Sequence, residues 1–185
     1  MMKVLMLCDQ RSEELGLKAV MEEFLSTHET ESLVFDYSKV KPCVGCYRCW
    51  IKTPGICIHQ EDKTNEVCAK IVNCDAVMIL NEITYGGYSA DIKAFLDRMI
   101  PNLSPYFEII KKEMRHKRRY SRYPDWLTVG YGDSSEEEKR IYSELNYRNA
   151  LNVRPKNYGA LTVKDKAELK QAKDQVLSLL KEESR

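Results

Sequence analysis

Short apolar runs alternate with amphipathic segments along most of the chain, and this alternation constrains the fold more than any other feature. The apolar runs have the length of β-strands and cover residues 3–8, 32–37, 76–80, 126–131 and 158–163. Apolar side chains spaced every three or four residues predict helices over 13–26, 62–73, 89–100, 134–149 and 165–182. Apolar strands separated by such helices are typical of a parallel sheet covered on both faces.

Five strand–helix units in 185 residues, without an internal repeat or a linker, predict a single α/β domain over residues 1–185. We expect a flavodoxin-like three-layer sandwich, in which a five-stranded parallel sheet takes the order 2-1-3-4-5 with helices on both faces. Ligands of this architecture lie beyond the carboxyl ends of the strands, beside strands one and three. The loops expected there cover residues 9–12, 38–61, 82–88 and 130–135.

Composition and charge exclude several classes of protein. Hydrophobic residues make up 43% of the chain and charged residues 31%, and every apolar run is far too short to cross a bilayer. The first apolar stretch is also too short for a signal peptide, so we expect a cytoplasmic protein. A formal net charge of +1 gives no overall attraction to nucleic acid or to a membrane.

One segment departs from this balance, because residues 111–123 hold seven Lys and Arg residues and one acid. Basic residues interleaved with tyrosines could contact nucleic acid, and a solvated loop or a subunit contact would use the same residues. Since the rest of the chain is balanced, we favour the loop or the subunit contact and do not expect nucleic acid as a partner. His28, His59 and His116 lie in polar stretches, for which we expect surface positions.

The first loop follows a strand and opens a helix, where backbone N–H groups and the helix dipole can bind phosphate. Arg11 and Ser12 would assist such binding, whereas Asp9, Glu13 and Glu14 would repel a phosphate. The loop contains no glycine and a single hydroxyl group. An ordinary capped helix start therefore explains the loop as well as a phosphate site does.

Two further loops, rich in glycine and tyrosine, are better candidates for binding. Glycine lets the backbone approach a planar ligand closely, and tyrosine offers aromatic surface. The candidate residues, at the ends of the third and fourth strands, are Tyr85, Gly86, Gly87, Tyr88, Ser89, Gly130, Tyr131 and Gly132. Together they predict a flat aromatic ligand, and Ser89 is also a natural N-cap for the following helix.

The seven cysteines fall into two groups, and a reducing compartment argues against disulfides for both. Cys8, Cys68 and Cys74 belong to predicted strands or helices, where we expect them to pack as small hydrophobic residues. The other four share one loop with C-x2-C-x2-C-x7-C spacing and are Cys43, Cys46, Cys49 and Cys57. Three cysteines spaced by two and a fourth from a turn can hold an iron–sulfur cubane. Zinc, or no ligand at all, is also compatible with the spacing.

Three motifs carry a resemblance to a known family. They are K-P-C-x-G-C-x-x-C-W-x-K-T-P-G-x-C over residues 41–57, Y-G-x-x-S-A-x-x-K-A-F-x-D-R over 85–98 and H-x-x-R-Y-x-x-Y-P over 116–124. In this order they resemble the NAD(P)H-dependent FMN reductase and iron–sulfur flavoprotein group of flavodoxin-like proteins. The resemblance implies FMN as the cofactor, NAD(P)H as the co-substrate, and a homodimer or homotetramer as the working unit.

The resemblance also implies roles for individual residues. Arg11 and Ser12 correspond to the family's phosphate loop, and residues 130–132 to a loop that lines the FMN pocket. The residues that correspond to contacts with the isoalloxazine ring are Tyr85, Gly86, Gly87 and Ser89. In the iron–sulfur members, the positions that bind a [4Fe-4S] cluster correspond to Cys43, Cys46, Cys49 and Cys57.

These observations leave three hypotheses for function. The first is an FMN-dependent oxidoreductase that takes electrons from NAD(P)H and passes them to an unidentified small-molecule or protein acceptor. The second is an iron–sulfur flavoprotein that carries single electrons between partner proteins. The third is a flavodoxin-fold binding module with weakened or lost FMN binding, which the acidic first loop favours. No residue is required by the sequence to be a general acid or base.

Overall fold

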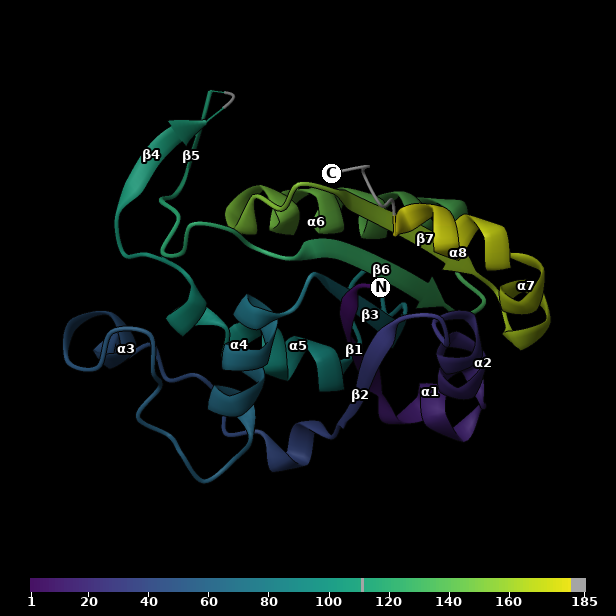
Figure 1. Cartoon of the computed structure of the whole chain (residues 1–185), viewed down its shortest axis with the longest axis horizontal. Helices are drawn as coiled ribbons and strands as arrows, with labels where there is room; N and C mark the ends of the chain where they lie inside the picture. The colour runs from purple at the N-terminus through teal and green to yellow at the C-terminus, as the bar shows by residue number, and fades with distance from the viewer. Residues whose placement is uncertain (111, 181–185) are drawn as a thin grey trace.

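Five parallel strands form the central sheet of the computed structural model, which describes residues 1–110 and 112–180. The strands are β1 (Lys3–Asp9), β2 (Glu29–Phe35), β3 (Ala76–Glu82), β6 (Asp125–Tyr131) and β7 (Tyr158–Val163). They lie in the order β2-β1-β3-β6-β7, and every neighbouring pair is parallel (Figure 1). The predicted order 2-1-3-4-5 is therefore confirmed.

Helices cover both faces of this sheet. One face carries α4 (Thr64–Asn73), α5 (Ala90–Asp97) and α6 (Glu136–Val153), and the other carries α1 (Gln10–Glu14), α2 (Leu17–Phe24), α7 (Lys166–Gln171) and α8 (Lys173–Leu179). The connections contain three short helices, which are η1 (Tyr37–Lys39), α3 (Arg48–Ile51) and η2 (Ile100–Asn102). Among the described residues, none of the helices combines the length and apolarity that a membrane span needs.

Two of the predicted helices are each divided into a pair. The segment predicted as one helix over 13–26 forms α1 and α2, because Gly16 between them has a φ angle of +68°, which interrupts a right-handed helix. The segment predicted over 165–182 forms α7 and α8, which meet at Ala172. Its last two residues lie outside the described part of the chain. The apolar stripes that predicted these helices are nevertheless buried.

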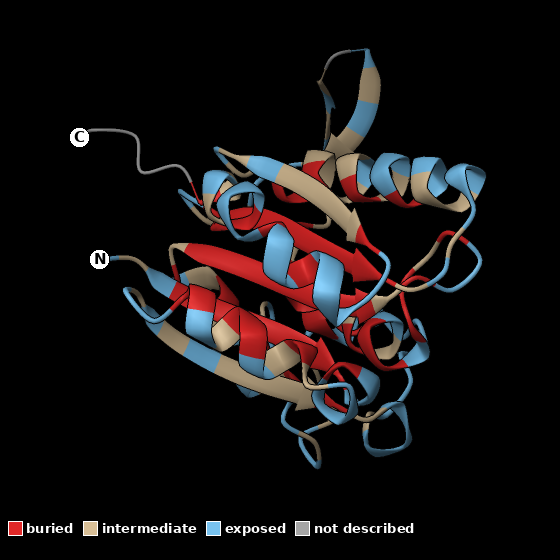
Figure 2. Ribbon diagram, turned by 90° about the vertical axis from the view of Figure 1, so that its right-hand side faces the viewer, coloured by how far each residue is buried: buried red, intermediate tan, exposed pale blue. Residues whose placement is uncertain are grey.

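Side chains alternate between the two faces of the sheet, so each central strand contributes to two cores. In β1, Val4 and Met6 point toward α2, α7 and α8, whereas Leu5 and Leu7 point toward α4, α5 and α6. Figure 2 shows the central strands buried between helices whose outer surfaces are exposed. Coverage of both faces explains why these strands are continuously apolar.

A two-stranded antiparallel hairpin, absent from the predicted elements, stands away from the sandwich (Figure 1). It consists of β4 (Phe107–Ile110) and β5 (Glu113–His116). Its acidic side chains are tied to the end of α6, because Glu108 pairs with Arg154 at 2.8 Å and Glu113 pairs with Arg148. Four-residue strands with mixed polarity give too short a periodic pattern to be predicted.

The basic segment 111–123 is held against the protein by several of its own arginines. Arg118 donates to the carbonyl oxygen of Arg154 at 2.7 Å, and Arg119 donates through Nε to that of Leu103 at 3.1 Å. Arg122 pairs with a carboxylate oxygen of Asp75 at 2.9 Å. Three arginines of the segment are thus bonded to other parts of the protein. Residue 111 lies outside the described part of the chain.

Candidate functional site

A buried carboxylate lies at the carboxyl edge of the sheet, where the loops after the parallel strands meet. Asp9, the last residue of β1, is only 1% exposed. Its Oδ1 accepts hydrogen bonds from the Ser12 N–H at 3.0 Å and the Tyr131 hydroxyl at 2.7 Å. Its Oδ2 accepts from the Glu82 N–H at 2.7 Å. The carboxylate therefore joins the start of α1 to the ends of β3 and β6.

A second buried carboxylate, Asp91 in the first turn of α5, connects the first loop to the second. It accepts the Gln10 N–H at 3.1 Å and the Tyr37 N–H at 2.9 Å. The first N–H groups of a helix have no partner inside the helix and are the groups that would bind an anion. In α1, the N–H groups of Gln10 and Ser12 are already bonded to Asp91 and Asp9.

The two residues predicted to assist phosphate binding also have partners inside the protein. Ser12 is fully buried, and its hydroxyl donates to the backbone carbonyl of Asp9 at 2.7 Å. Arg11 pairs through Nε with Glu82 at 3.3 Å. The structure thus brings Arg11 and Ser12 to the expected edge but engages both with acidic or carbonyl groups.

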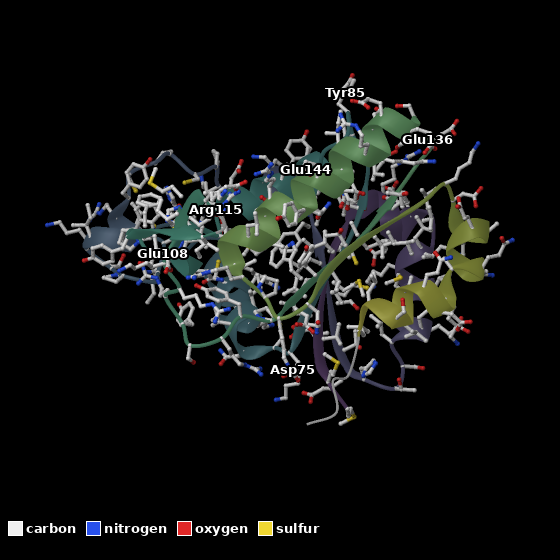
Figure 3. All side chains as sticks on the ribbon, turned by 90° about the horizontal axis from the view of Figure 1, so that it is seen from above. Asp75, Tyr85, Glu108, Arg115, Glu136 and Glu144 are labelled. Carbon is white, nitrogen blue, oxygen red and sulfur yellow. The ribbon has the colours of Figure 1, made fainter. Side chains whose placement is uncertain are left out.

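The third loop forms a tight turn, closed by two hydrogen bonds between the backbones of Thr84 and Gly87. Tyr85 within this turn has a φ angle of +50° and is 91% exposed, and Figure 3 shows it projecting from the surface. Gly86 packs against α6, since a Cβ atom there would lie 2.8 Å from side-chain atoms of Ile141. Ser89 precedes α5, and its buried hydroxyl has no hydrogen-bond partner among the described residues.

Tyr88 does not offer an exposed aromatic face, which differs from the expectation for this residue. It is buried, and its hydroxyl donates to Asn146 at 2.6 Å and accepts from Asn149 at 3.0 Å. With Gly87 it lines a cavity of about 320 Å³ between α5 and α6. The other lining residues are mostly apolar and include Leu96 and Leu145.

The fourth loop contributes mainly to packing and to the Asp9 network. A Cβ atom at Gly130 would lie 2.7 Å from Ile83 and from Tyr142, so packing alone requires glycine there. Tyr131 is buried, which is again different from an exposed aromatic surface. Burial, and after it the negative charge of Asp9, raises the pKa of Tyr131 far above its ordinary value, so its hydroxyl stays protonated and donates. Gly132 has a φ angle of +129°, and a Cβ atom there would be in ordinary contact with Glu82 at 3.8 Å.

The carboxyl edge therefore fits one part of FMN and not the other. On the side of the third loop, the unpartnered hydroxyl of Ser89 and the exposed ring of Tyr85 are groups that a flat polar ring could use. At the start of α1, buried carboxylates occupy the donors that would bind the phosphate. The residues present thus fit the isoalloxazine ring but not the phosphate group.

The four loop cysteines line a single cavity of about 260 Å³. Cys43 and Cys46 are exposed, Cys57 is partly buried, and Cys49 is buried. Burial, followed by the neighbouring thiols of Cys57, Cys43 and Cys46, raises the pKa of Cys49. Within the described residues, however, no three His, Cys, Asp or Glu side chains are gathered closely enough to hold a metal ion. The four thiols match the donor set of a cluster or of zinc, but their spacing does not match a formed site.

Polar side chains fasten this loop at its base. Arg98, whose side chain is fully buried, pairs with Asp62 at 2.9 Å and donates to the carbonyl oxygen of Lys41 at 2.5 Å, so it joins both ends of the loop. Asn65 exchanges two hydrogen bonds of 2.8 and 2.9 Å with the backbone of Cys57. The Trp50 indole donates to two carbonyl oxygens beyond α5.

The cysteine loop is predicted at the carboxyl edge of the sheet, beside the switch point between β1 and β3. The cysteine cavity lies elsewhere. The cavity is lined by Asp97 and Arg98 at the end of α5, whereas Asp91 at the start of α5 binds the first loop. The six or seven residues from Asp91 to Asp97 and Arg98 correspond to about 10 Å along the helix. Figures 1 and 3 both show α3 and its loop on the opposite side of the molecule from α1 and α2.

The remaining three cysteines are placed as predicted, whereas His116 is not. Cys8, Cys68 and Cys74 are buried, as expected for packing residues, and burial raises the pKa of each thiol to about 12. His116 is not a free surface residue, because its ring lies 4.5 Å from that of Phe107 and 5.5 Å from that of Trp50, measured between centroids. It therefore joins the hairpin to the cysteine loop.

Sequence reasoning missed Asp91 and Arg98, the two charged residues that organise the edge and the loop. A signal for both exists, since they are seven residues apart and share the buried stripe of α5 with Phe95. A charged residue at a core position of an amphipathic helix is rarely unpaired. The role of Asp9 as a hydrogen-bond acceptor was also not predicted. Its signal is a single acid directly after an apolar run.

The strand order and the loops gathered at the β1–β3 switch point define a flavodoxin-like α/β protein. Within that class, the chain belongs to the NADPH-dependent FMN reductase family, whose sequence profile matches residues 2–118. The matched part contains the first and third loops of the carboxyl edge and the whole cysteine loop. The family resemblance of the motifs is therefore confirmed.

Two curated relatives are iron–sulfur flavoproteins from archaea. The protein of Methanocaldococcus jannaschii is 32% identical over 86 residues, which cover 46% of this chain and 42% of that protein. The protein of Archaeoglobus fulgidus is 31% identical over 86 residues, which cover 46% of this chain and 38% of that protein. The matched segment thus spans less than half the length of either relative.

Solved structures agree on the fold. An NAD(P)H:quinone oxidoreductase from Methanothermobacter marburgensis superposes with a TM-score of 0.65 at 16% identity and covers 99% of each chain. Flavodoxin 1 from Bacillus cereus superposes with a TM-score of 0.55 at 11% identity, covering 98% of this chain and 99% of the flavodoxin. At such identities the likeness shows the flavodoxin-like fold alone.

Proposed function

We propose that this protein is an FMN-dependent oxidoreductase that moves electrons from NAD(P)H to a small-molecule or protein acceptor. The observation that carries the proposal is the family match over residues 2–118, which includes two loops of the carboxyl edge. The unpartnered buried hydroxyl of Ser89 at that edge supports it, because a buried polar group without a partner marks a place for a ligand.

The residues of the chain have separate tasks in this proposal. Tyr85 covers the ring and limits the access of water, and Ser89 supplies one hydrogen bond to it. Gly86, Gly87 and Gly132 shape the backbone around the ring, while Tyr88, Gly130 and Tyr131 hold the loops in place from within. A bound flavin supplies the hydride and single-electron chemistry.

A spectroscopic titration tests this function. The purified chain is expected to show flavin absorbance, or to quench the fluorescence of added flavin, and then to oxidise NADH or NADPH. We expect Ser89→Ala to weaken flavin binding by about tenfold, the effect of losing one buried hydrogen bond. Ser178→Ala on the distant helix α8 is the matched control and should leave binding unchanged. A colourless protein that takes up no added flavin would contradict the proposal.

A second candidate function is that of an electron carrier with a [4Fe-4S] cluster, favoured by the four thiols that line one cavity. Because the thiols are not gathered into a formed site, we propose that the ion or cluster itself would draw them together, as metals often do when binding is coupled to folding. Anaerobic reconstitution with iron and sulfide tests this. Cys46→Ser should abolish the uptake of iron, whereas Cys74→Ser, at a buried packing position, should not.

Other properties follow from the same proposal. We propose one domain over residues 1–185, and a homodimer or homotetramer supported by the exposed apolar pair of Ile109 and Met114 on the hairpin. Sedimentation of the full chain would test the oligomer. A cytoplasmic location is proposed because all seven thiols are free.

A further inference from the structure

Four anion-binding groups of the first loop are engaged with groups of the chain itself. Asp9 and Asp91 accept two of the N–H groups at the start of α1, and the Arg11 guanidinium pairs with Glu82. The Ser12 hydroxyl, the one hydroxyl of the loop, donates to a backbone carbonyl. In the flavodoxin-like architecture, this first loop at the β1–β3 switch point is the place where a cofactor phosphate would be expected.

The surroundings of the Asp9 carboxylate resemble those that proteins provide for a phosphate oxygen. Two backbone N–H groups and a tyrosine hydroxyl donate to it at 2.7 to 3.0 Å, and it is almost completely excluded from solvent. Donors of these kinds are typical phosphate ligands. The carboxylate therefore receives hydrogen bonds of the kind that an anionic ligand at this edge would need.

We propose that Asp9 is an internal anion that replaces the cofactor phosphate, so that the flavin site of this protein recognises the ring portion and gains no affinity from the phosphate. The inference rests on the proposed flavin-binding function and specifies the ligand of that site. FMN is then bound no more than about threefold more tightly than riboflavin. Asp9 acts as a specificity-determining residue, with Asp91 as a second negative charge that opposes an incoming phosphate.

A ligand phosphate cannot readily displace this carboxylate. Asp9 is covalently attached to β1, so it needs no translational entropy to reach its donors, whereas a free ligand loses that entropy on binding. If the carboxylate turned away, the phosphate would still lie beside two acids, Asp91 and Glu82, with Arg11 as the basic side chain of the loop. Both effects favour the internal anion.

Asp165 provides a matched control elsewhere in the same sheet. Like Asp9, it follows a parallel strand and caps a short helix, accepting the N–H groups of Ala167 and Glu168 at 2.8 and 3.0 Å. It follows β7, which lies three strands away from β1, and its hydrogen bonds are exposed to solvent. Asp165→Ser therefore removes a capping carboxylate without altering the switch point.

The experiment titrates the full chain with riboflavin and with FMN and follows quenching of flavin fluorescence. For the unaltered protein, we expect FMN to bind no more than about threefold better than riboflavin. Asp9→Ser opens three donors to a ligand, so FMN should gain at least about tenfold over riboflavin, the effect of one or two charge-assisted hydrogen bonds. Asp165→Ser should keep the ratio of the unaltered protein. A preference of the unaltered protein for FMN of more than about threefold would overturn the proposal.

Inorganic phosphate separates this inference from the flavin-binding function. If neither flavin binds, the proposed function fails, and the inference is then decided by the melting temperature with phosphate against chloride of equal ionic strength. Phosphate should raise the Tm of Asp9→Ser but not that of the unaltered protein or of Asp165→Ser. An equal response of all three proteins would overturn the inference. If Asp9→Ser does not fold, Asp9→Gly removes the side chain that occupies the three donors, is tolerated at an N-cap and serves in the same measurements.

Discussion

The carboxyl edge of the sheet and the cysteine loop use buried charges in different ways. At the edge, Asp9 and Asp91 fill the space between loops and accept backbone N–H groups that would otherwise face a ligand. In the cysteine loop, the buried pair of Arg98 and Asp62 holds only the base. Beyond that base, the thiols of Cys43 and Cys46 remain exposed.

This difference separates a first loop whose buried carboxylates are fully bonded from a cysteine loop whose thiols are not gathered into a metal site. Every buried carboxylate at the edge has its hydrogen bonds satisfied by the chain, so that region is ordered by its own contacts. The cysteine loop presents four thiols around one cavity without bringing them into a metal site. The buried ion pair fixes only the base of the cysteine loop. Such an arrangement is consistent with the proposal that an ion or cluster would order the rest of the loop on binding.

The largest effect is expected when the base of the cysteine loop is broken. Arg98→Met keeps the length of the side chain and leaves the buried carboxylate of Asp62 without its charged partner. Removing one partner of a buried ion pair lowers the free energy of unfolding by about 3–5 kcal/mol. Urea denaturation measures this loss. Arg140→Met, whose exposed pair with Glu137 lies on the surface of α6, is the control and should give no measurable loss. Equal midpoints for the two variants would show that Arg98 does not hold the loop.

A smaller loss of stability is expected when a glycine is replaced by alanine, and it should differ between Gly86 at the packed edge and Gly45 in the cysteine loop. Gly86 and Gly45 have similar φ angles of +74° and +64°, so an alanine is strained to a similar degree at both. At Gly86 the new Cβ would also lie 2.8 Å from Ile141, whereas at Gly45 nothing lies within 4 Å. We expect a loss of about 2–4 kcal/mol for Gly86→Ala and about 1 kcal/mol for Gly45→Ala. Thermal unfolding measures both, and similar losses would mean that packing against α6 contributes nothing.

The sequence predicted the sheet well because its signals are local and strong. Five apolar runs and their amphipathic neighbours predicted all five parallel strands and their order. The break at Gly16 and the hairpin from Phe107 to His116 were missed, since one depends on a single φ angle and the other on very short strands. Periodicity carries little information about either feature.

The candidate site was predicted less completely, because its organisation depends on contacts between distant residues. Asp9 meets Tyr131 across 122 positions of sequence, and Asp91 meets Gln10 across 81. No local pattern shows that Asp9 turns inward, where it stabilises the loop, rather than outward like Glu13 and Glu14, where it would only repel a phosphate. Local patterns also do not show how far the cysteine cavity lies from the switch point. That distance depends on the direction of α5, whose end lines the cavity.

The smallest expected effect is the pH dependence of the buried pair at the base of the cysteine loop. Burial of Asp62 opposes ionisation, but hydrogen bonds from Thr64 and the Lys41 backbone, together with the charge of Arg98, lower the pKa of Asp62 below its ordinary value of 3.8. Because the folded pKa lies below the unfolded one, the stabilisation is complete above about pH 4 and is lost as the pH falls through the folded value.

Urea midpoints measured between pH 6 and pH 2.5 should therefore fall more steeply for the unaltered protein than for Asp62→Asn, which lacks the titrating group. Asp133→Asn, at a side chain that is 84% exposed and far from the loop base, is the control and should leave the slope unchanged. If the curve for Asp62→Asn ran parallel to that of the unaltered protein, the charge of Asp62 would contribute nothing, and the loop would be held by neutral hydrogen bonds such as those of Asn65.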